Sequence, residues 1–210
     1  QEQAVPIIET YVDAFSDPSI DYVVVPSGSC TGAVREQHVR IAERYGSKAL
    51  ADGAEQTANK TYDLSEFIVD VAGTTDVGAF FPHRVTYHSS CHSRRFIKVG
   101  ERPKELLRNV EGLELVDLPN EEECCGFGGT FAVKMPEVSA AMVSDKAMHI
   151  KETKAEYVTA GDSSCLMNIA GAMSRQHNGI RALHMAEILA STKEHPLTPM
   201  SAAYSKEKML

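Results

Sequence analysis

The stretch "EYVTAGDSSCLMNIAGAMSRQ", residues 156–176, decides the fold. Its first five residues, "EYVTA" (156–160), form a short, largely apolar run that is typical of a buried strand. The last eleven, "LMNIAGAMSRQ" (166–176), repeat their apolar side chains at helical spacing. A strand that passes through a short loop into a helix is the repeating unit of α/β folds.

Strand-like and helical segments alternate along the rest of the chain. Strand patterns lie at residues 21–25, 84–88 and 113–118, and helical patterns at residues 31–45, 64–73, 102–110 and 136–153. A helical stripe also begins the chain, at Val5, Ile8, Val12 and Phe15. Residues 46–62 fit either a loop or a helical extension. This alternation predicts an α/β fold with largely parallel sheets.

The chain also repeats itself. "DYVVVPSGSC" (21–30) aligns without a gap on "EYVTAGDSSC" (156–165), at an offset of 135 residues, and a helical pattern precedes each copy. We therefore expect two pseudo-repeated halves. Residues 1–75 would be the remainder of a first repeat whose upstream part is missing, residues 76–192 a complete second repeat, and residues 193–210 a C-terminal tail.

Four of the five cysteines are placed to meet in space. Cys91, Cys124 and Cys165 each follow a predicted strand by three to six residues, in loops that a parallel sheet gathers at the carboxyl ends of its strands. Cys125 adjoins Cys124, and the glycines after them give the backbone freedom to turn both thiols the same way. An odd number of cysteines argues against a disulfide framework. This pattern indicates a thiolate-rich metal centre.

Composition excludes several classes of partner. The chain contains no apolar run of eighteen residues and no cleavable secretory signal, so we expect a cytoplasmic protein without a membrane span. Its net charge of −8, without a block of basic residues, disfavours nucleic acid and anionic lipid as partners.

The cysteine spacing resembles that of the cysteine-rich CCG-domain proteins. Cys91 is followed by 32 residues, then by Cys124, Cys125 and Gly126, and after 35 more by "DSSC" (162–165). Relatives of this kind include the cysteine-rich subunit of heterodisulfide reductase, the iron-sulfur subunit of glycolate oxidase and the lactate-utilisation protein A group. The phrases "VVVPSGSC", "YHSSCH", "ECCGFGGTFAVKMPEVS" and "DSSCLMNI" are most similar to the last group, over roughly residues 1–190.

The resemblance implies an iron-sulfur electron-transfer subunit of a cytosolic system that oxidises L-lactate to pyruvate. Its partners would be other lactate-utilisation subunits, an iron-sulfur protein and a LutC-like protein, so the chain would be one component of an oxidoreductase complex. The implied cofactor is an iron-sulfur cluster, 4Fe-4S in preference to 2Fe-2S, since four thiolates are the usual number of ligands for either type. The implied ligands are Cys91, Cys124, Cys125 and Cys165.

Two departures from the family pattern limit this inference. The family's Cys-x-x-Cys begins here with Asp162, so a five-cysteine site like that of heterodisulfide reductase cannot form unchanged. Asp162 would either add an oxygen ligand or form hydrogen bonds at the start of the following helix. Cys30 has no Cys-Cys-Gly partner in its own repeat, so we expect at most one complete site.

Other interpretations remain open. Four thiolates also make a closed zinc site, which would define a zinc-stabilised scaffold subunit without redox activity. A redox subunit could instead serve glycolate or thiol-disulfide chemistry. His88 and His92 flank Cys91 and could replace a thiolate, donate hydrogen bonds to cluster sulfurs or serve a structural role. They are also the candidates for catalytic proton transfer, because no other histidine adjoins the expected centre.

Overall fold

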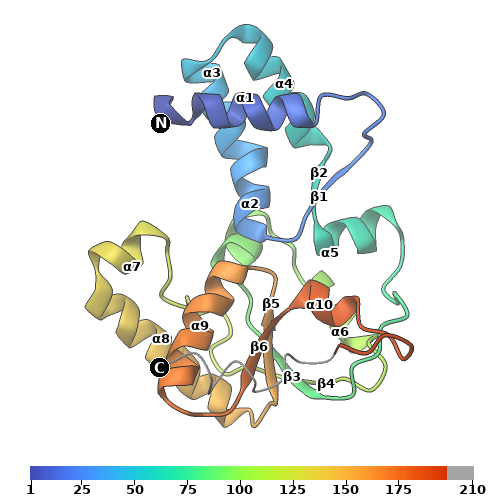
Figure 1. Cartoon of the computed structure of the whole chain (residues 1–210), viewed down its shortest axis with the longest axis vertical. Coiled ribbons are helices and arrows are strands. Elements are labelled where there is room, and N and C mark those ends of the chain that lie inside the picture. Colours follow the sequence, from blue (N-terminus) through green and yellow to red (C-terminus); the bar gives the residue numbers. More distant parts are fainter. Residues whose placement is uncertain (198–210) are drawn as a thin grey trace, which may run out of the picture.

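The computed structural model describes residues 1–197 and contains two parallel sheets (Figure 1). The smaller sheet pairs β1 (Val23–Val25) with β2 (Thr61–Asp63). The larger has the order β4-β3-β5-β6, with β3 at Arg84–Tyr87, β4 at Glu114–Val116, β5 at Tyr157–Ala160 and β6 at Arg181–His184. The prediction of an α/β protein with parallel sheets is confirmed.

The strand order of the larger sheet creates a switch point between β3 and β5. The chain leaves β3 toward β4 on one side and later returns to pair β5 with the other side of β3. In open parallel sheets, the loops at such a point diverge and leave a crevice beyond the carboxyl ends of the strands. Cys91 follows β3 and Cys165 follows β5, so the sheet topology itself brings these two cysteines to one crevice.

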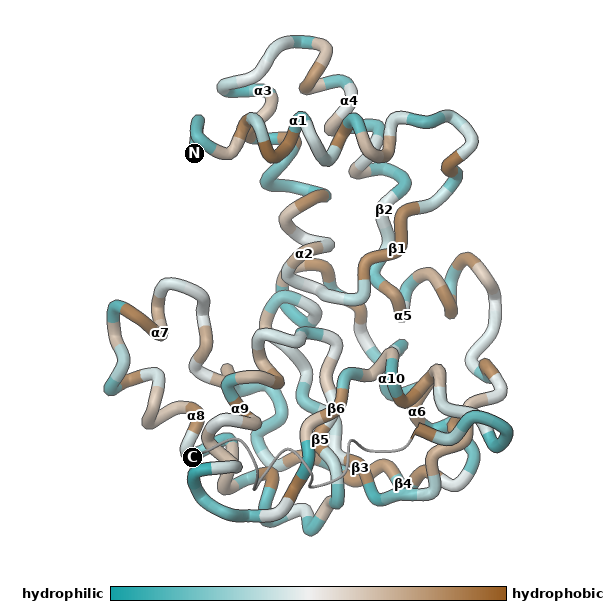
Figure 2. Tube along the Cα trace, in the orientation of Figure 1, coloured by the Kyte–Doolittle hydropathy of each residue, from teal (hydrophilic) through white to brown (hydrophobic). Residues whose placement is uncertain are grey.

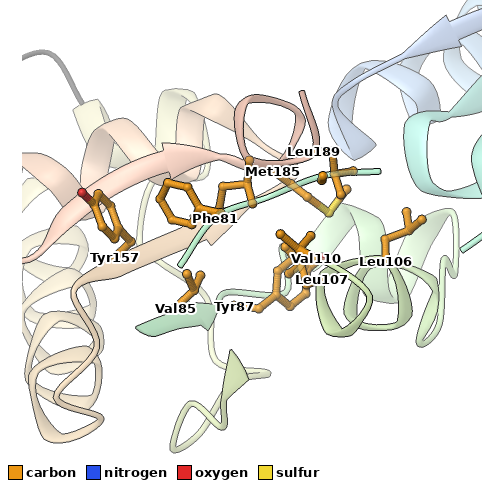
Figure 3. Packing of buried hydrophobic residues seen from close by; sticks show 11 residues of the cluster. Phe81, Val85, Tyr87, Leu106, Leu107, Val110, Tyr157, Met185 and Leu189 are labelled. Carbon is orange, nitrogen blue, oxygen red and sulfur yellow. The ribbon is translucent and has the colours of Figure 1, made fainter. Parts of the chain in front are cut away.

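Helices cover both faces of the larger sheet. On one face α6 (Arg102–Arg108) and α10 (Met185–Leu189) pack against Val85, Tyr87 and Tyr157 (Figure 3). On the other face, α8 (Pro136–Glu152) and α9 (Ser163–Arg175) pack around Val158. Tyr157 and Val158 face opposite sides because successive side chains of a strand alternate.

The N-terminal part of the chain forms a separate helical layer. α1 (Val5–Ala14), α3 (Val39–Tyr45) and α4 (Lys48–Asn59) pack around Ile8, Ala42, Leu50 and Ala54. Figures 1 and 2 show α2 (Gly28–Gly32) running from this layer toward the larger sheet. Residues 46–62, for which two alternatives were open, contain helix α4 and strand β2. Ser47 caps α4 by accepting a hydrogen bond from the Leu50 N–H at 3.1 Å.

Several predicted helices include a wider, π-helical turn. The helix predicted at residues 31–45 consists of α2, the π-helical η2 (Ala33–His38) and α3. That predicted at 64–73 consists of α5 (Leu64–Glu66) and η3 (Phe67–Val71), and a third π-helical segment, η4 (His92–Phe96), follows Cys91. Such turns are often found at functional sites.

Some elements have no counterpart among the sequence-based assignments. These are η1 (Glu2–Ala4), β2, α7 (Thr130–Lys134), η4, β6 and α10. Strand β2 leads into α5 and strand β6 into α10, each through a capping box, formed by Asp63 with Glu66 and by His184 with Glu187. The two parallel pairs, β1–β2 and β5–β6, therefore share local features beyond the aligned ten residues. The residue boundaries of the two predicted repeats stay a prediction.

Two further points concern the ends of the chain and its helices. Of the predicted C-terminal tail, residues 198–210 lie outside the described residues, and Leu197 packs against the core that contains Phe81. Within residues 1–197, no helix combines the length and the apolar character that crossing a bilayer would require.

Candidate metal centre

The structure gathers the four predicted ligand cysteines at one cavity. Cys91, Cys124, Cys125 and Cys165 all line a space of about 590 Å³. The thiols influence one another's ionisation in the order Cys91, Cys124, Cys125 and Cys165, and the sulfurs of Cys125 and Cys165 lie within 4.8 Å of each other. All are free thiols, and Cys125 and Cys165 are buried. Cysteines spread over 75 residues of sequence thus line one cavity.

The Cys-Cys-Gly loop is held in a conformation that requires glycine. Gly126 has a φ of +82°, and its N–H donates to Cys124 Sγ at 3.4 Å. The Ser139 hydroxyl donates to the Gly126 carbonyl at 2.7 Å, and the Asn168 side-chain amide donates to the Cys125 carbonyl at 2.8 Å. These contacts anchor the loop to α8 and α9. Because both peptide carbonyls are held from outside, the two neighbouring thiols can face the cavity together.

His88 is a buried histidine next to two of these cysteines. Its side chain is 1% exposed, and neither ring nitrogen has a hydrogen-bond partner. A ring nitrogen of His88 and the sulfurs of Cys125 and Cys165 all lie within 4.8 Å of one another. Burial lowers the pKa of His88 to about 3, so the imidazole is neutral near pH 7. A neutral imidazole offers one lone pair for a metal and one N–H for a sulfur.

The thiols disfavour one another's ionisation. The hydrogen bond with Cys125 and burial raise the pKa of Cys124 well above its usual range. The hydrogen bond from Cys124 favours the Cys125 thiolate, but the hydrogen bond with Cys165 and burial outweigh it and raise the pKa of Cys125 to about 12. Burial also raises the pKa of Cys91. Four thiolates can therefore coexist here only around a cation. A metal cation would also provide a partner for a His88 nitrogen, which has none in the described part of the chain.

Asp162 lies at the edge of this cavity, but serines occupy its carboxylate oxygens. Oδ1 accepts hydrogen bonds from the hydroxyls of Ser27 and Ser29, both at 2.6 Å, and Oδ2 accepts one from Ser90. Burial favours the neutral acid, but these hydrogen bonds outweigh it and lower the pKa of Asp162. Asp162 is the N-cap residue of α9 without capping that helix through its side chain. The Asp162 carboxylate therefore does accept hydrogen bonds, but from serines in other segments and not from the start of α9.

The last two candidate residues, His92 and Cys30, differ in where they lie relative to the cavity. His92 is exposed at the cavity, with its Nδ1 atom 3.6 Å from Cys91 Sγ. Cys30 is exposed and is not among the residues that line the cavity. The first half instead contributes Ser29 and Gln37. Ser29 lies in the aligned "PSGSC" stretch, so the internal repeat could have identified it as a residue of the site. No sequence pattern identifies Gln37, on η2, as a residue of the cavity.

Comparison with known proteins defines the class first. The family model for the cysteine-rich CCG domain matches residues 85–170, which include all four cysteines of the cavity. The chain therefore contains a cysteine-rich CCG domain, and this domain holds a buried cysteine and histidine cluster suited to a metal.

Individual relatives then narrow the family. The chain is 47% identical to lactate utilization protein A of Oceanobacillus iheyensis over 174 residues, which cover 83% of this chain and 70% of that protein. It is 50% identical to that of a Geobacillus species over 171 residues (81% and 71%) and 43% identical to that of Bacillus subtilis over 185 residues (88% and 74%). The chain belongs to the lactate utilization protein A family, and the resemblance noted in the sequence is confirmed.

Proposed function

We propose that this chain is the iron-sulfur electron-transfer subunit of a system that oxidises L-lactate to pyruvate. The observation that carries the proposal is the set of four cysteines that line one cavity, two of them next to a buried imidazole with no hydrogen-bond partner. The name of the relatives, lactate utilization protein A, supports the pathway. The partners in this proposal are other lactate-utilisation subunits, an iron-sulfur protein and a LutC-like protein.

In this proposal each residue has a defined task. Cys91, Cys124, Cys125 and Cys165 hold the cluster, which supplies one-electron transfer when bound. His88 faces the buried side, where its N–H can hydrogen-bond a sulfur or its lone pair can take the place of a thiolate. His92 stands at the exposed side and is the candidate for moving protons between the site and solvent.

The proposal also includes the division into two repeats, over residues 1–75 and 76–192. The second repeat holds the site, and the first contributes the serines that bind Asp162. Cys30, exposed and away from the cavity, is then the isolated cysteine of the first repeat.

The test is the metal content of anaerobically purified protein. We expect a brown protein with broad visible absorption and with iron and acid-labile sulfide in equal amounts, because thiolate-bound iron-sulfur clusters contain both. A colourless protein with one zinc per chain, even after cluster reconstitution, would contradict electron transfer and support the zinc-stabilised scaffold.

A matched pair of variants checks the ligand set in the same measurement. Cys165→Ser should lose most of the bound iron, since removing one of four thiolates opens the centre. Cys30→Ser should retain it, because Cys30 is exposed and away from the cavity. Equal iron loss from both variants would show that the ligand set is wrong.

A further inference from the structure

Lys146 is a buried lysine beneath the cysteine loop. It lies on α8, between the apolar positions Val143, Ala147 and Ile150, and its side chain is 1% exposed. Its ammonium group donates a hydrogen bond to the Asn120 carbonyl at 2.6 Å. Lysine is almost never fully buried unless its charge is paired. Something must therefore offset the charge of this one.

The neighbouring carboxylates lie against other side chains and form no ion pair with Lys146. Glu121 pairs with Lys104, and Glu123 lies 3.7 Å from His149. Among residues 1–197, Lys146 forms no ion pair with a carboxylate. One carbonyl oxygen is thus the protein partner of a buried cation, which is an unfavourable arrangement when nothing else compensates for it.

Lys146 lies on the same face of α8 as Ser139 and Val143, the face against which Gly126 and the core around Cys125 and Cys165 pack. Burial lowers the pKa of Lys146, while negative charge on Glu123, Cys125, Glu121 and Cys124, in that order, favours its charged form; the charge of Lys146 in turn disfavours protonation of His88. Lys146 therefore acts electrostatically on both the cysteine pair and the imidazole of the site. A divalent metal held by four thiolates has a net negative charge, which would supply what the ammonium group lacks.

We propose that Lys146 is the built-in counter-charge of the metal centre, stabilising the thiolate-bound state and raising the reduction potential of a cluster held there. This inference depends on the proposed function for its ligand set, Cys91, Cys124, Cys125 and Cys165. Lys146 is a positioning and charge-balancing residue that touches no reacting atom. Its position behind the Cys-Cys-Gly loop separates it from the exposed lysines of the chain.

The first experiment removes the charge and measures metal binding with Co²⁺ alone. Lys146→Met should bind Co²⁺ about tenfold more weakly than wild type, because the buried positive charge near the thiolates is lost. Lys151→Met, an exposed position on the same helix, is the matched control and should bind as wild type does. The metal-free Lys146→Met protein should melt at a higher temperature than metal-free wild type, since an unpaired buried cation has been removed.

The second experiment measures the reduction potential after cluster reconstitution. The potential should fall in Lys146→Met and stay unchanged in Lys151→Met, because a nearby positive charge favours the reduced, more negative cluster. Lys146→Gln keeps an N–H donor for the Asn120 carbonyl without the charge, and serves if the methionine variant does not fold. We expect the same fall in potential for the glutamine variant.

Two results separate the possible failures. Unchanged Co²⁺ affinity and unchanged potential in both neutral variants would overturn the role of Lys146 while leaving the electron-transfer proposal intact. A wild-type protein that binds Co²⁺ in a Lys146-dependent way but takes up no iron-sulfur cluster would support the counter-charge role and overturn electron transfer.

Discussion

At the residue scale, His88 combines deep burial with two nitrogens that bind nothing in the protein. Burial and the charge of Lys146 lower its pKa, while Asp162 opposes them, and the outcome is a value of about 3. An unfolded histidine has a pKa near about 6.5. Between these values the unfolded chain binds the extra proton and the folded chain does not. The stability of the metal-free protein must therefore fall as the pH falls through this range.

We predict a loss of about 2 kcal/mol in the free energy of unfolding of the metal-free protein between pH 7 and pH 5 from this group. Urea denaturation at the two pH values measures it. His88→Leu should remove most of that loss, whereas His92→Leu, which changes an exposed imidazole, should retain it. The same pH dependence in wild type and His88→Leu would contradict the burial of a neutral imidazole.

At the element scale, the loop that contains Cys124 and Cys125 depends on Gly126. A Cβ atom added at Gly126 would lie 2.6 Å from the Ser139 carbonyl oxygen, which belongs to the backbone of α8. The loop would have to move away from α8, and the two cysteines would move with it. The positive φ of Gly126 adds a second penalty that side chains rarely accept.

We predict that Gly126→Ala lowers the free energy of unfolding by about 2–4 kcal/mol and reduces metal retention. Gly129→Ala is the control: Gly129 also has a positive φ, of +62°, but a Cβ there meets nothing within 4 Å. That variant should show the smaller conformational penalty alone. Equal effects of both substitutions on denaturation and metal content would mean that contact with α8 does not hold the loop.

At the scale of the whole molecule, the N-terminal part of the chain contacts the segment that holds the four cysteines, and its residues Ser29 and Gln37 line the cavity. Ser27 and Asp162, which occupy equivalent positions in the internal repeat, hydrogen-bond to each other across the contact. Helix α2 also packs closely against η4: a Cβ at Gly28 would lie 2.1 Å from Ser93 Oγ and 3.0 Å from the Ser93 backbone nitrogen. The first half thereby covers the segment that begins with Cys91.

We predict that Gly28→Ala separates the halves, lowers the free energy of unfolding by about 1–3 kcal/mol and speeds the reaction of the cysteines with a thiol reagent. Gly171→Ala is the matched control, since Gly171 also lies in a helix and its Cβ would meet Arg175 at 3.7 Å. That substitution should be neutral or stabilising by up to about 1 kcal/mol. Equal thiol reactivity in both variants would show that the first half does not shield the site.

The sequence alone determined two features: the alternation of strands and helices, and the convergence of Cys91, Cys124, Cys125 and Cys165 on one site. Both depend on local features: apolar periodicity defines each element, and loops after parallel strands share one edge of the sheet. The strand β6, "RALH", was missed because its pattern is weak. It becomes a strand through four paired residues along β5, from Tyr157 to Ala160, which lie some twenty residues away in sequence.

Only the tertiary structure decided what surrounds the cysteines. Asp162 was considered as a ligand, but its oxygens accept hydrogen bonds from serines up to 135 residues away. His88 is near Cys91 in sequence, yet in space it joins Cys125 and Cys165. Lys146 is of a residue type that normally lies at the surface. In the structure it is buried beneath the loop that precedes Cys124. Burial, charge balance and hydrogen-bond partners depend on contacts between distant segments, and such contacts leave no periodic trace in the sequence around any one residue.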